Sequence, residues 1–231
     1  LGYITATPGE MGDWNNGSPQ QIVDAINSGT FLVQHRDHGL ETGWGEPAFR
    51  NNHVDQLTNT GKLAFIMSIN CLTGKYNLGS DCFAERFMRH TYNGQNAGAV
   101  AMLCPTEVSF SFVNDAYVWG VYDQFDPDFM PDYGPYADYE GNWFPAFGNV
   151  AGKYFLYQCS WPYNYYDKDI TYQMFTAHCD AFLRIYSEVP QEMIVTHQDV
   201  QIAGLTTFNI TAPENAIIAL TKEIDNGEIE I

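Results

Sequence analysis

The 231-residue sequence is poor in positive charge and contains no long apolar run. Ten Lys and Arg residues stand against 28 Asp and Glu residues, which gives a formal net charge of −18. Phosphate binding needs clustered cations, so this balance argues against nucleic acid as a partner. It fits a cationic substrate or partner, but colloidal solubility alone is the simpler explanation. Without about 20 consecutive apolar residues, no membrane-spanning helix is predicted.

The five cysteines lack the close CxxC spacing of zinc ribbons and show no disulfide framework. Their odd number predicts at least one unpaired thiol. Cys82, Cys104 and Cys159 lie in apolar or helical surroundings, and we expect them to be packing residues. No signal peptide begins the chain, and its first residue is Leu rather than Met, so we expect a processed piece of a precursor.

The chain does contain short apolar runs that alternate with amphipathic segments. The runs lie near residues 29–35, 63–71 and 97–104, and helices are expected near 18–27, 53–62, 80–94 and 113–125. Strands that are apolar on both faces, separated by helices, are typical of a parallel sheet covered by helices. The sequence therefore predicts an α/β fold with a mostly parallel sheet.

The composition and apolar pattern of the sequence change toward its carboxyl end. Residues 126–145 are rich in Pro, Gly, Asp and Tyr and predict a long loop, and two helices are expected at about 146–160 and 168–180. From residue 189 onward, short alternating runs are broken by Gly, Pro and Asn, a pattern typical of a β-sandwich. We therefore expect a first domain over 1–188 and the beginning of a second over 189–231.

Reactive side chains follow two of the predicted strands. One strand leads into His38 and Gly39, and the next leads into Cys71, which is 33 residues after His38. Functional groups gather at the carboxyl ends of parallel strands, so His38 and Cys71 are expected side by side. A thiolate nucleophile with a nearby imidazole is the machinery of a cysteine peptidase. Main-chain N–H groups of Gly39 and Cys71 are candidate oxyanion donors.

These residues also have other interpretations. His35 and His38 resemble a zinc pair in composition, but strand alternation separates them and no further cluster supplies ligands. Cys71 can be a buried structural cysteine, although the polar turn that follows it indicates that the strand emerges there. The run His178–Cys179–Asp180 is also metal-like in composition, and we interpret it as structural because it lies on a closing segment.

The ordered set of these motifs resembles the gingipain-type cysteine peptidases of family C25, which share the caspase-like fold. The dipeptide His38–Gly39, the nucleophile position Cys71, "ETGWG" and "FAERF" carry the resemblance. It implies an endopeptidase with Cys71 as nucleophile and His38 as general acid/base, requiring no cofactor for its chemistry. It further implies a secreted or bacterial cell-surface protein, a protein or peptide substrate, and an immunoglobulin-like domain beginning near residue 189.

The sequence departs from the family pattern in two ways. Asp37 stands where the family usually has a small residue, and an acid there tends to raise the pKa of a neighbouring imidazole. The carboxylate that orients the imidazole in the family lies farther upstream than the 37 residues that precede His38 here. We therefore expect a companion N-terminal segment or chain from the same precursor.

The substrate pocket is expected after the third strand. Glu107 and Asp115 can meet a basic side chain before the scissile bond, and Trp44 either flanks the cleft or only packs. Asn114 is interpreted as the N-cap of the helix that follows.

The family also binds calcium, which implies a structural calcium ion. Asp126, Asp128 and Asp132 are candidate ligands, but they lack EF-hand spacing, so a solvated loop is the simpler interpretation.

A rival to the peptidase is a catalytically idle relative that serves as a surface binding or adhesion module. A metal hydrolase built on His35 and His38 ranks below both.

Overall fold

The structure is a computed structural model, and it describes residues 17–129, 141–160, 165–186, 192–223 and 229–230. The chain divides into two compact units, Leu1–Ser187 and Glu188–Ile231.

The first unit is built around a four-stranded sheet with the strand order β1-β4-β7-β8. Its strands are β1 (Leu32–Arg36), β4 (Ala64–Ile69), β7 (Ala99–Pro105) and β8 (Phe175–His178). The pairs β1–β4 and β4–β7 are parallel, whereas β8 runs antiparallel to β7. The mostly parallel α/β sheet expected from the apolar runs is thus confirmed.

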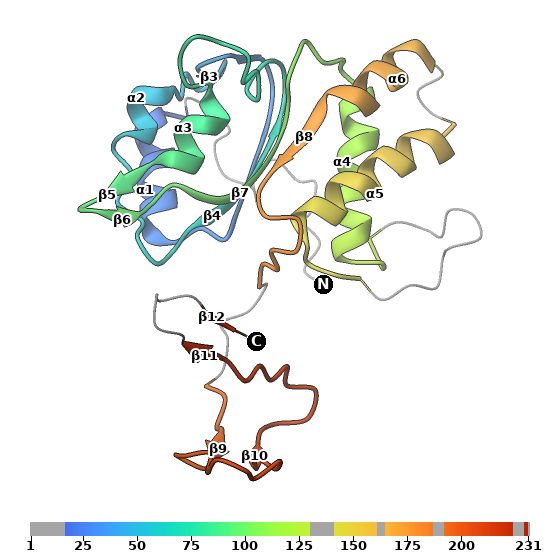
Figure 1. Cartoon of the computed structure of the whole chain (residues 1–231). Coiled ribbons are helices and arrows are strands. Elements are labelled where there is room, and N and C mark those ends of the chain that lie inside the picture. The colour runs from blue at the N-terminus through green and yellow to red at the C-terminus, as the bar shows by residue number, and fades with distance from the viewer. Residues whose placement is uncertain (1–16, 130–140, 161–164, 187–191, 224–228, 231) are drawn as a thin grey trace, which may run out of the picture. The chain divides into compact units, whose positions relative to one another are not determined.

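Helices cover both faces of this sheet (Figure 1). One face packs against α1 (Pro19–Ser28), α2 (Asn51–Val54) and α3 (Phe83–Arg89), and the other against α4 (Val113–Phe125), α5 (Pro145–Gln158) and α6 (Tyr165–Met174). Every residue of β4 is buried, which explains its continuous apolar sequence: its side chains alternate between two cores.

The first helix begins and ends where the sequence predicts. The Oγ of Ser18 accepts a hydrogen bond from the N–H of Gln21 at 3.3 Å, and the Oε1 of Gln21 accepts the N–H of Ser18 at 2.8 Å. This reciprocal pair is a capping box, and Pro19 occupies the first turn. Gly29 ends the helix with a φ of 103°, a conformation that glycine adopts without a Cβ penalty.

Two further helices are shorter than expected. Helix α2 covers only Asn51–Val54 of the region in which residues 53–62 were expected to be helical. Helix α3 is preceded by Cys82 as its N-cap, and the carboxylate of Glu85 accepts the N–H of Cys82 at 3.0 Å. It ends at Arg89, and a short hairpin follows, formed by β5 (Thr91–Tyr92) and β6 (Gln95–Asn96).

The expected helix over 168–180 is wrong in its second half. Helix α6 ends at Met174, and residues 175–178 form strand β8, which pairs Phe175 with Pro105 and His178 with Met102. Phe175 is fully buried in the core beneath α4 and α5. Pairing with the edge of β7 and burial of this side chain outweigh the local helical pattern.

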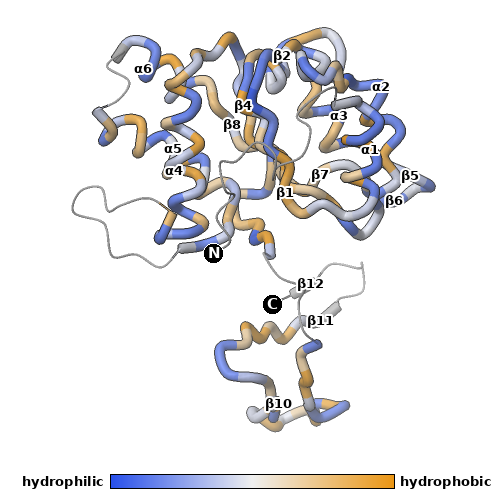
Figure 2. Tube along the Cα trace, turned by 180° about the vertical axis from the view of Figure 1, so that it is seen from behind, coloured by the Kyte–Doolittle hydropathy of each residue, from blue (hydrophilic) through white to orange (hydrophobic). Residues whose placement is uncertain are grey.

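The second unit contains two short antiparallel pairs. They are β9 (Thr196–His197) with β10 (Ile210–Thr211), and β11 (Lys222–Glu223) with β12 (Ile229–Glu230). Several apolar side chains of this unit are exposed, including Ile194 and Ile217, and Figure 2 shows its hydrophobic stretches. The immunoglobulin-like assignment of this region stays a prediction. Among the described helices of the chain, none is long and apolar enough to cross a membrane.

Candidate active site

The two reactive residues follow strand ends that lie side by side. Strands β1 and β4 are parallel neighbours, and their last paired residues are Arg36 and Ile69. His38 comes two residues after Arg36, and Cys71 comes two residues after Ile69. The register of the sheet therefore carries His38 and Cys71 to the same edge at matching positions.

Gly39 lies directly against the segment that carries the cysteine. A Cβ at this position would lie 2.4 Å from the carbonyl oxygen of Cys71 and 2.7 Å from the side-chain Cγ of Asn70. Such distances are far below ordinary van der Waals contact, so only glycine fits here without a shift. The His38–Gly39 and Asn70–Cys71 segments are thus in direct contact.

His38 is exposed, and a tight hairpin holds its main chain. The hairpin consists of β2 (Gly39–Leu40) and β3 (Gly43–Trp44), and the N–H of Gly45 donates to the carbonyl of His38 at 2.7 Å. The side chain of this histidine is therefore open to solvent on a fixed backbone.

Cys71 is half-buried, and its thiol lies against Ser109. The N–H of Ser109 donates to the Sγ of Cys71 at 3.4 Å, and the Sγ lies 3.6 Å from the carbonyl oxygen of Ser109. The main chain of Ser109 can thus donate to a thiolate and accept from a thiol. None of the five cysteines, all of which lie in described residues, forms a disulfide.

The turn after Cys71 is braced by the last residue of β7 and by the segment that follows it. The N–H of Leu72 donates to the carbonyl of Glu107 at 3.2 Å, and the N–H of Gly74 donates to the carbonyl of Pro105 at 2.8 Å. Leu72 has a φ of 64°, a left-handed conformation that a non-glycine residue rarely adopts. The cysteine therefore leads into an unusual turn that is held by two main-chain hydrogen bonds.

Asp37, the departure from the family pattern, supports the loop after the hairpin. Its Oδ2 accepts a hydrogen bond from the N–H of Glu46 at 3.1 Å. This contact gives the acid a structural role beside the candidate imidazole.

His35 is buried, unlike His38, and its ring stacks on Trp44 with centroids 4.4 Å apart. Burial lowers the pKa of His35 below its ordinary value, while the main-chain bond with Glu46 and the charge of Asp37 act in the opposite direction.

The three candidate pocket residues have other contacts in the structure. Trp44 is only 1% exposed and donates from its Nε1 to Ser68, which favours the packing alternative over the cleft wall. Glu107 forms an ion pair with Lys75 at 2.8 Å, and Asp115 forms one with Arg36 at 2.8 Å. A substrate cation would have to compete with these lysine and arginine side chains.

Asn114 is not the N-cap of its helix. Helix α4 begins at Val113 with Phe112 at the N-cap, so Asn114 lies within the first turn. Its Nδ2 donates instead to the Oγ of Ser109 at 2.8 Å. Sequence reasoning missed Ser109 altogether, and the only available signal was its position shortly after the third strand.

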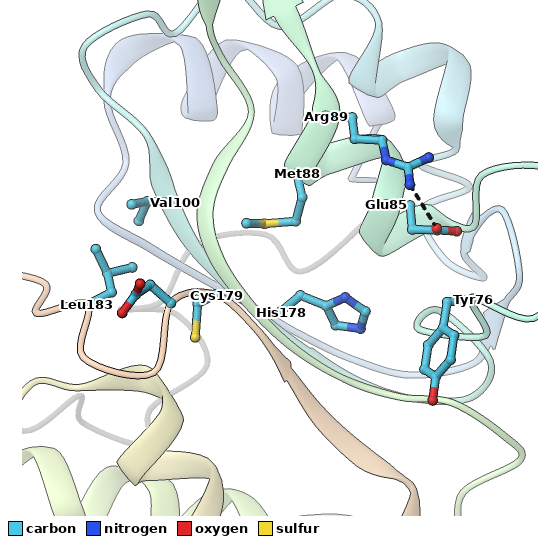
Figure 3. Close-up of a pocket in the computed structure, with 9 residues that line it drawn as sticks. Tyr76, Glu85, Met88, Arg89, Val100, His178, Cys179 and Leu183 are labelled. Carbon is cyan, nitrogen blue, oxygen red and sulfur yellow. Dashed lines mark ion pairs between the residues drawn. The ribbon is translucent and has the colours of Figure 1, made fainter. Parts of the chain in front are cut away.

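A separate cavity of about 570 Å³ lies between α3 and the end of β8 (Figure 3). Met88, Val100 and Leu183 form its apolar lining, and His178 and Glu85 stand among its polar groups. Burial lowers the pKa of His178. The run His178–Cys179–Asp180 lines this cavity, and its interpretation as structural stays a prediction.

The calcium expectation falls partly outside the described residues. Asp132 is one of the residues that the structure does not describe, and the Oδ1 of Asp126 accepts the N–H of Asp128 at 3.2 Å. Among described residues, no group of three or more His, Cys, Asp or Glu side chains is arranged to hold a metal ion. Calcium binding therefore stays a prediction.

The fold, with histidine and cysteine at neighbouring strand ends, defines a caspase-like α/β protein. The sequence profile described as "Peptidase family C25" matches residues 5–160, and the chain belongs to this family.

Known relatives agree with this assignment. The chain is 31% identical to Gingipain R2 of Porphyromonas gingivalis over 216 residues, which cover 92% of this chain and 27% of that protein. Gingipain R1 of Porphyromonas gingivalis is 42% identical over 89 residues, which cover 38% of this chain and 9% of the relative.

Solved structures show the same likeness. The crystal structure of the Arg-specific cysteine proteinase gingipain R superposes with a TM-score of 0.69 at 27% identity, covering 84% of this chain and 42% of that one. A complex of Porphyromonas gingivalis RgpB pro- and mature domains matches with a TM-score of 0.69 at 26% identity, covering 84% of this chain and 43% of that one. The chain thus spans about a quarter of the first relative and less than half of the solved chains.

Proposed function

We propose that this chain supplies the nucleophile and the acid/base of a cysteine endopeptidase, Cys71 and His38. The observation that carries the proposal is the matched placement of these residues, each two positions beyond the paired ends of neighbouring parallel strands. The direct contact of Gly39 with the carbonyl of Cys71 supports it, because it joins the two segments.

The chemistry then runs in two halves. His38 accepts the thiol proton of Cys71, the Sγ attacks the scissile carbonyl carbon, the S–C bond forms, and the carbonyl π electrons move to the oxygen. The amide C–N bond breaks as His38 gives a proton to the departing amine, which leaves a thioester on Cys71. Water, deprotonated by His38, attacks the thioester carbonyl and releases the carboxylic acid and the thiol. Main-chain N–H groups of Gly39 and Cys71 are the proposed donors to the oxyanion.

We extend the proposal to a preference for a basic residue before the scissile bond. The relative gingipain R is described as Arg-specific, and the net charge of −18 favours cationic peptides. Glu107 and Asp115 already pair with cations of the chain, so they serve this preference only if a substrate cation displaces Lys75 or Arg36.

A companion segment is proposed at the open edge of the sheet. Among described strands, β1 pairs only with β4, so its other edge lacks a strand partner. Parallel sheets are normally covered on both faces, and an open edge exposes unpaired main-chain groups. An upstream segment of the same precursor fits this position, and a secreted or cell-surface location is proposed with it by likeness to the gingipains.

The test combines thiol labelling with peptide hydrolysis in the full-length protein. A peptidyl acyloxymethyl ketone with Arg at its reactive end is expected to label Cys71 at least ten times faster than Cys179, a half-buried thiol that serves as the matched control. Cys71→Ala and His38→Ala should abolish hydrolysis, whereas Cys179→Ala should not change it. Equal, slow labelling of both cysteines in wild-type protein would refute the peptidase and favour the idle binding module.

A further inference from the structure

The side chain of Asn70, the residue before the candidate nucleophile, is the centre of a buried polar network. It is 1% exposed. Its Nδ2 lies 2.9 Å from the Nδ1 of His35 and donates to the Oγ of Ser68 at 2.8 Å. Its Oδ1 accepts the hydroxyl of Thr73 at 2.9 Å. The amide thus connects strand β1, strand β4 and the turn after Cys71.

The hydrogen-bonding partners fix which nitrogen of the His35 imidazole carries the proton and how the side-chain amide of Asn70 is oriented. The Nε2 of His35 lies 3.1 Å from the carbonyl oxygen of Glu46, which can only accept, so this nitrogen carries the proton. The Nδ1 is then an acceptor, and the amide must present its NH₂ to it. The stacked Trp44 is uncharged, and Asp37 is the charged side chain that acts on this imidazole.

Asn70 also contacts both halves of the candidate site. Its side chain packs against Gly39, which follows His38, at a distance that leaves no room for a Cβ. Its main-chain carbonyl accepts a hydrogen bond from the Oγ of Ser109, the residue whose N–H contacts the Sγ of Cys71. Any movement of Asn70 therefore changes the placement of the histidine segment relative to the thiol.

We propose that Asn70 is a positioning residue that sets the spacing between the His38–Gly39 segment and Cys71 through its amide bonds to His35 and Thr73. The proposal rests on the function proposed above. An amide suits this place because it donates from one end and accepts at the other. A carboxylate of the same shape would accept at both ends, and an apolar residue would leave buried polar partners unsatisfied.

The test is Asn70→Asp, which preserves the shape and removes the donor. An ionised carboxylate cannot donate to the Nδ1 of His35, and its negative charge next to Cys71 disfavours the thiolate form. We expect kcat to fall by about 10- to 100-fold, since a misplacement of about 1 Å costs about that much, with KM changed less than about twofold. The pH profile of Cys71 alkylation should move to higher pH.

Asn59→Asp is the matched control. Asn59 is also buried, its Nδ2 donates to the carbonyl of Gly98 at 2.9 Å, and its Oδ1 accepts the N–H of Gly98 at 2.8 Å. It braces the other end of the sheet, so its substitution should lower the melting temperature without moving the alkylation profile of Cys71.

A double-mutant cycle with His35→Gln tests whether Asn70 acts through this partner. The combined effect on Cys71 alkylation should be clearly smaller than the product of the single effects, because both changes disrupt one contact. The proposal would be overturned if the two substitutions reduced the rate of Cys71 alkylation independently, so that their effects multiplied. Equal losses of that rate in Asn70→Asp and Asn59→Asp would also overturn it. If wild-type protein hydrolyses no peptide, the proposed peptidase fails, while the alkylation rates still decide the role of Asn70.

Discussion

Gly39→Ala is the sharpest perturbation that the structure offers. The added Cβ would lie 2.4 Å from the carbonyl oxygen of Cys71. A carbon–oxygen contact relaxes at roughly 3.4 Å, so the two segments must separate by about 1 Å. Overpacking of this kind costs about 1–3 kcal/mol of unfolding free energy. A displacement of about 1 Å between the proposed acid/base His38 and the proposed nucleophile Cys71 should also lower kcat/KM by about 100-fold.

The measurement is hydrolysis of an Arg-containing peptide, with thermal unfolding in parallel. Gly79→Ala is the control, because a Cβ there meets nothing within 4 Å and the residue is not in the left-handed region. It should leave activity unchanged and alter stability by less than about 1 kcal/mol. Wild-type activity and wild-type stability in Gly39→Ala would refute the close contact between the two segments.

Three further predictions concern stability. Burial lowers the pKa of His35, so the stability that comes from its neutral form is full above about pH 6.5 and is lost as the pH falls. The urea midpoint of the wild-type protein should therefore drop between about pH 7.5 and about pH 5, and that of His35→Gln should drop by less. Burial also lowers the pKa of His178, which contributes a drop of the same sign to both proteins. Asp115→Asn removes an ion pair with Arg36, and because both side chains are partly exposed, solvent screens their attraction. The free energy of unfolding, measured by urea denaturation, should fall by less than about 1 kcal/mol, and a fall of more than about 3 kcal/mol would contradict the prediction. Phe83→Ala empties a fully buried site and should cost about 3–5 kcal/mol, whereas a melting temperature within about 2 °C of wild type would contradict its placement in the core.

Much of the first unit follows from short-range patterns. The apolar run over β4, the capping box at Ser18 and the spacing of His38 and Cys71 are local signals. Parallel pairing then places the two strand ends together, because β1 and β4 are joined by a single crossover.

The remaining features depend on contacts between distant residues. Asn70 meets His35 across 35 residues, and this pairing needs the exact register of two strands. Asn114 has the residue type of a helix cap, but Ser109 offers its side chain a partner inside the first turn. Strand β8 has a helical local pattern, and only the free edge of β7 makes it a strand.

The main-chain bonds from Leu72 and Gly74 to Glu107 and to the last residue of β7 bear on the thermodynamics of peptide recognition. A turn already fixed before a peptide arrives loses little conformational entropy on binding. Binding at the Cys71 turn should therefore need little loop ordering, and the amide protons of Leu72 and Gly74 should exchange slowly with solvent even without a ligand. If the proposed function is right, a peptide substrate meets the cysteine turn as a preorganised surface.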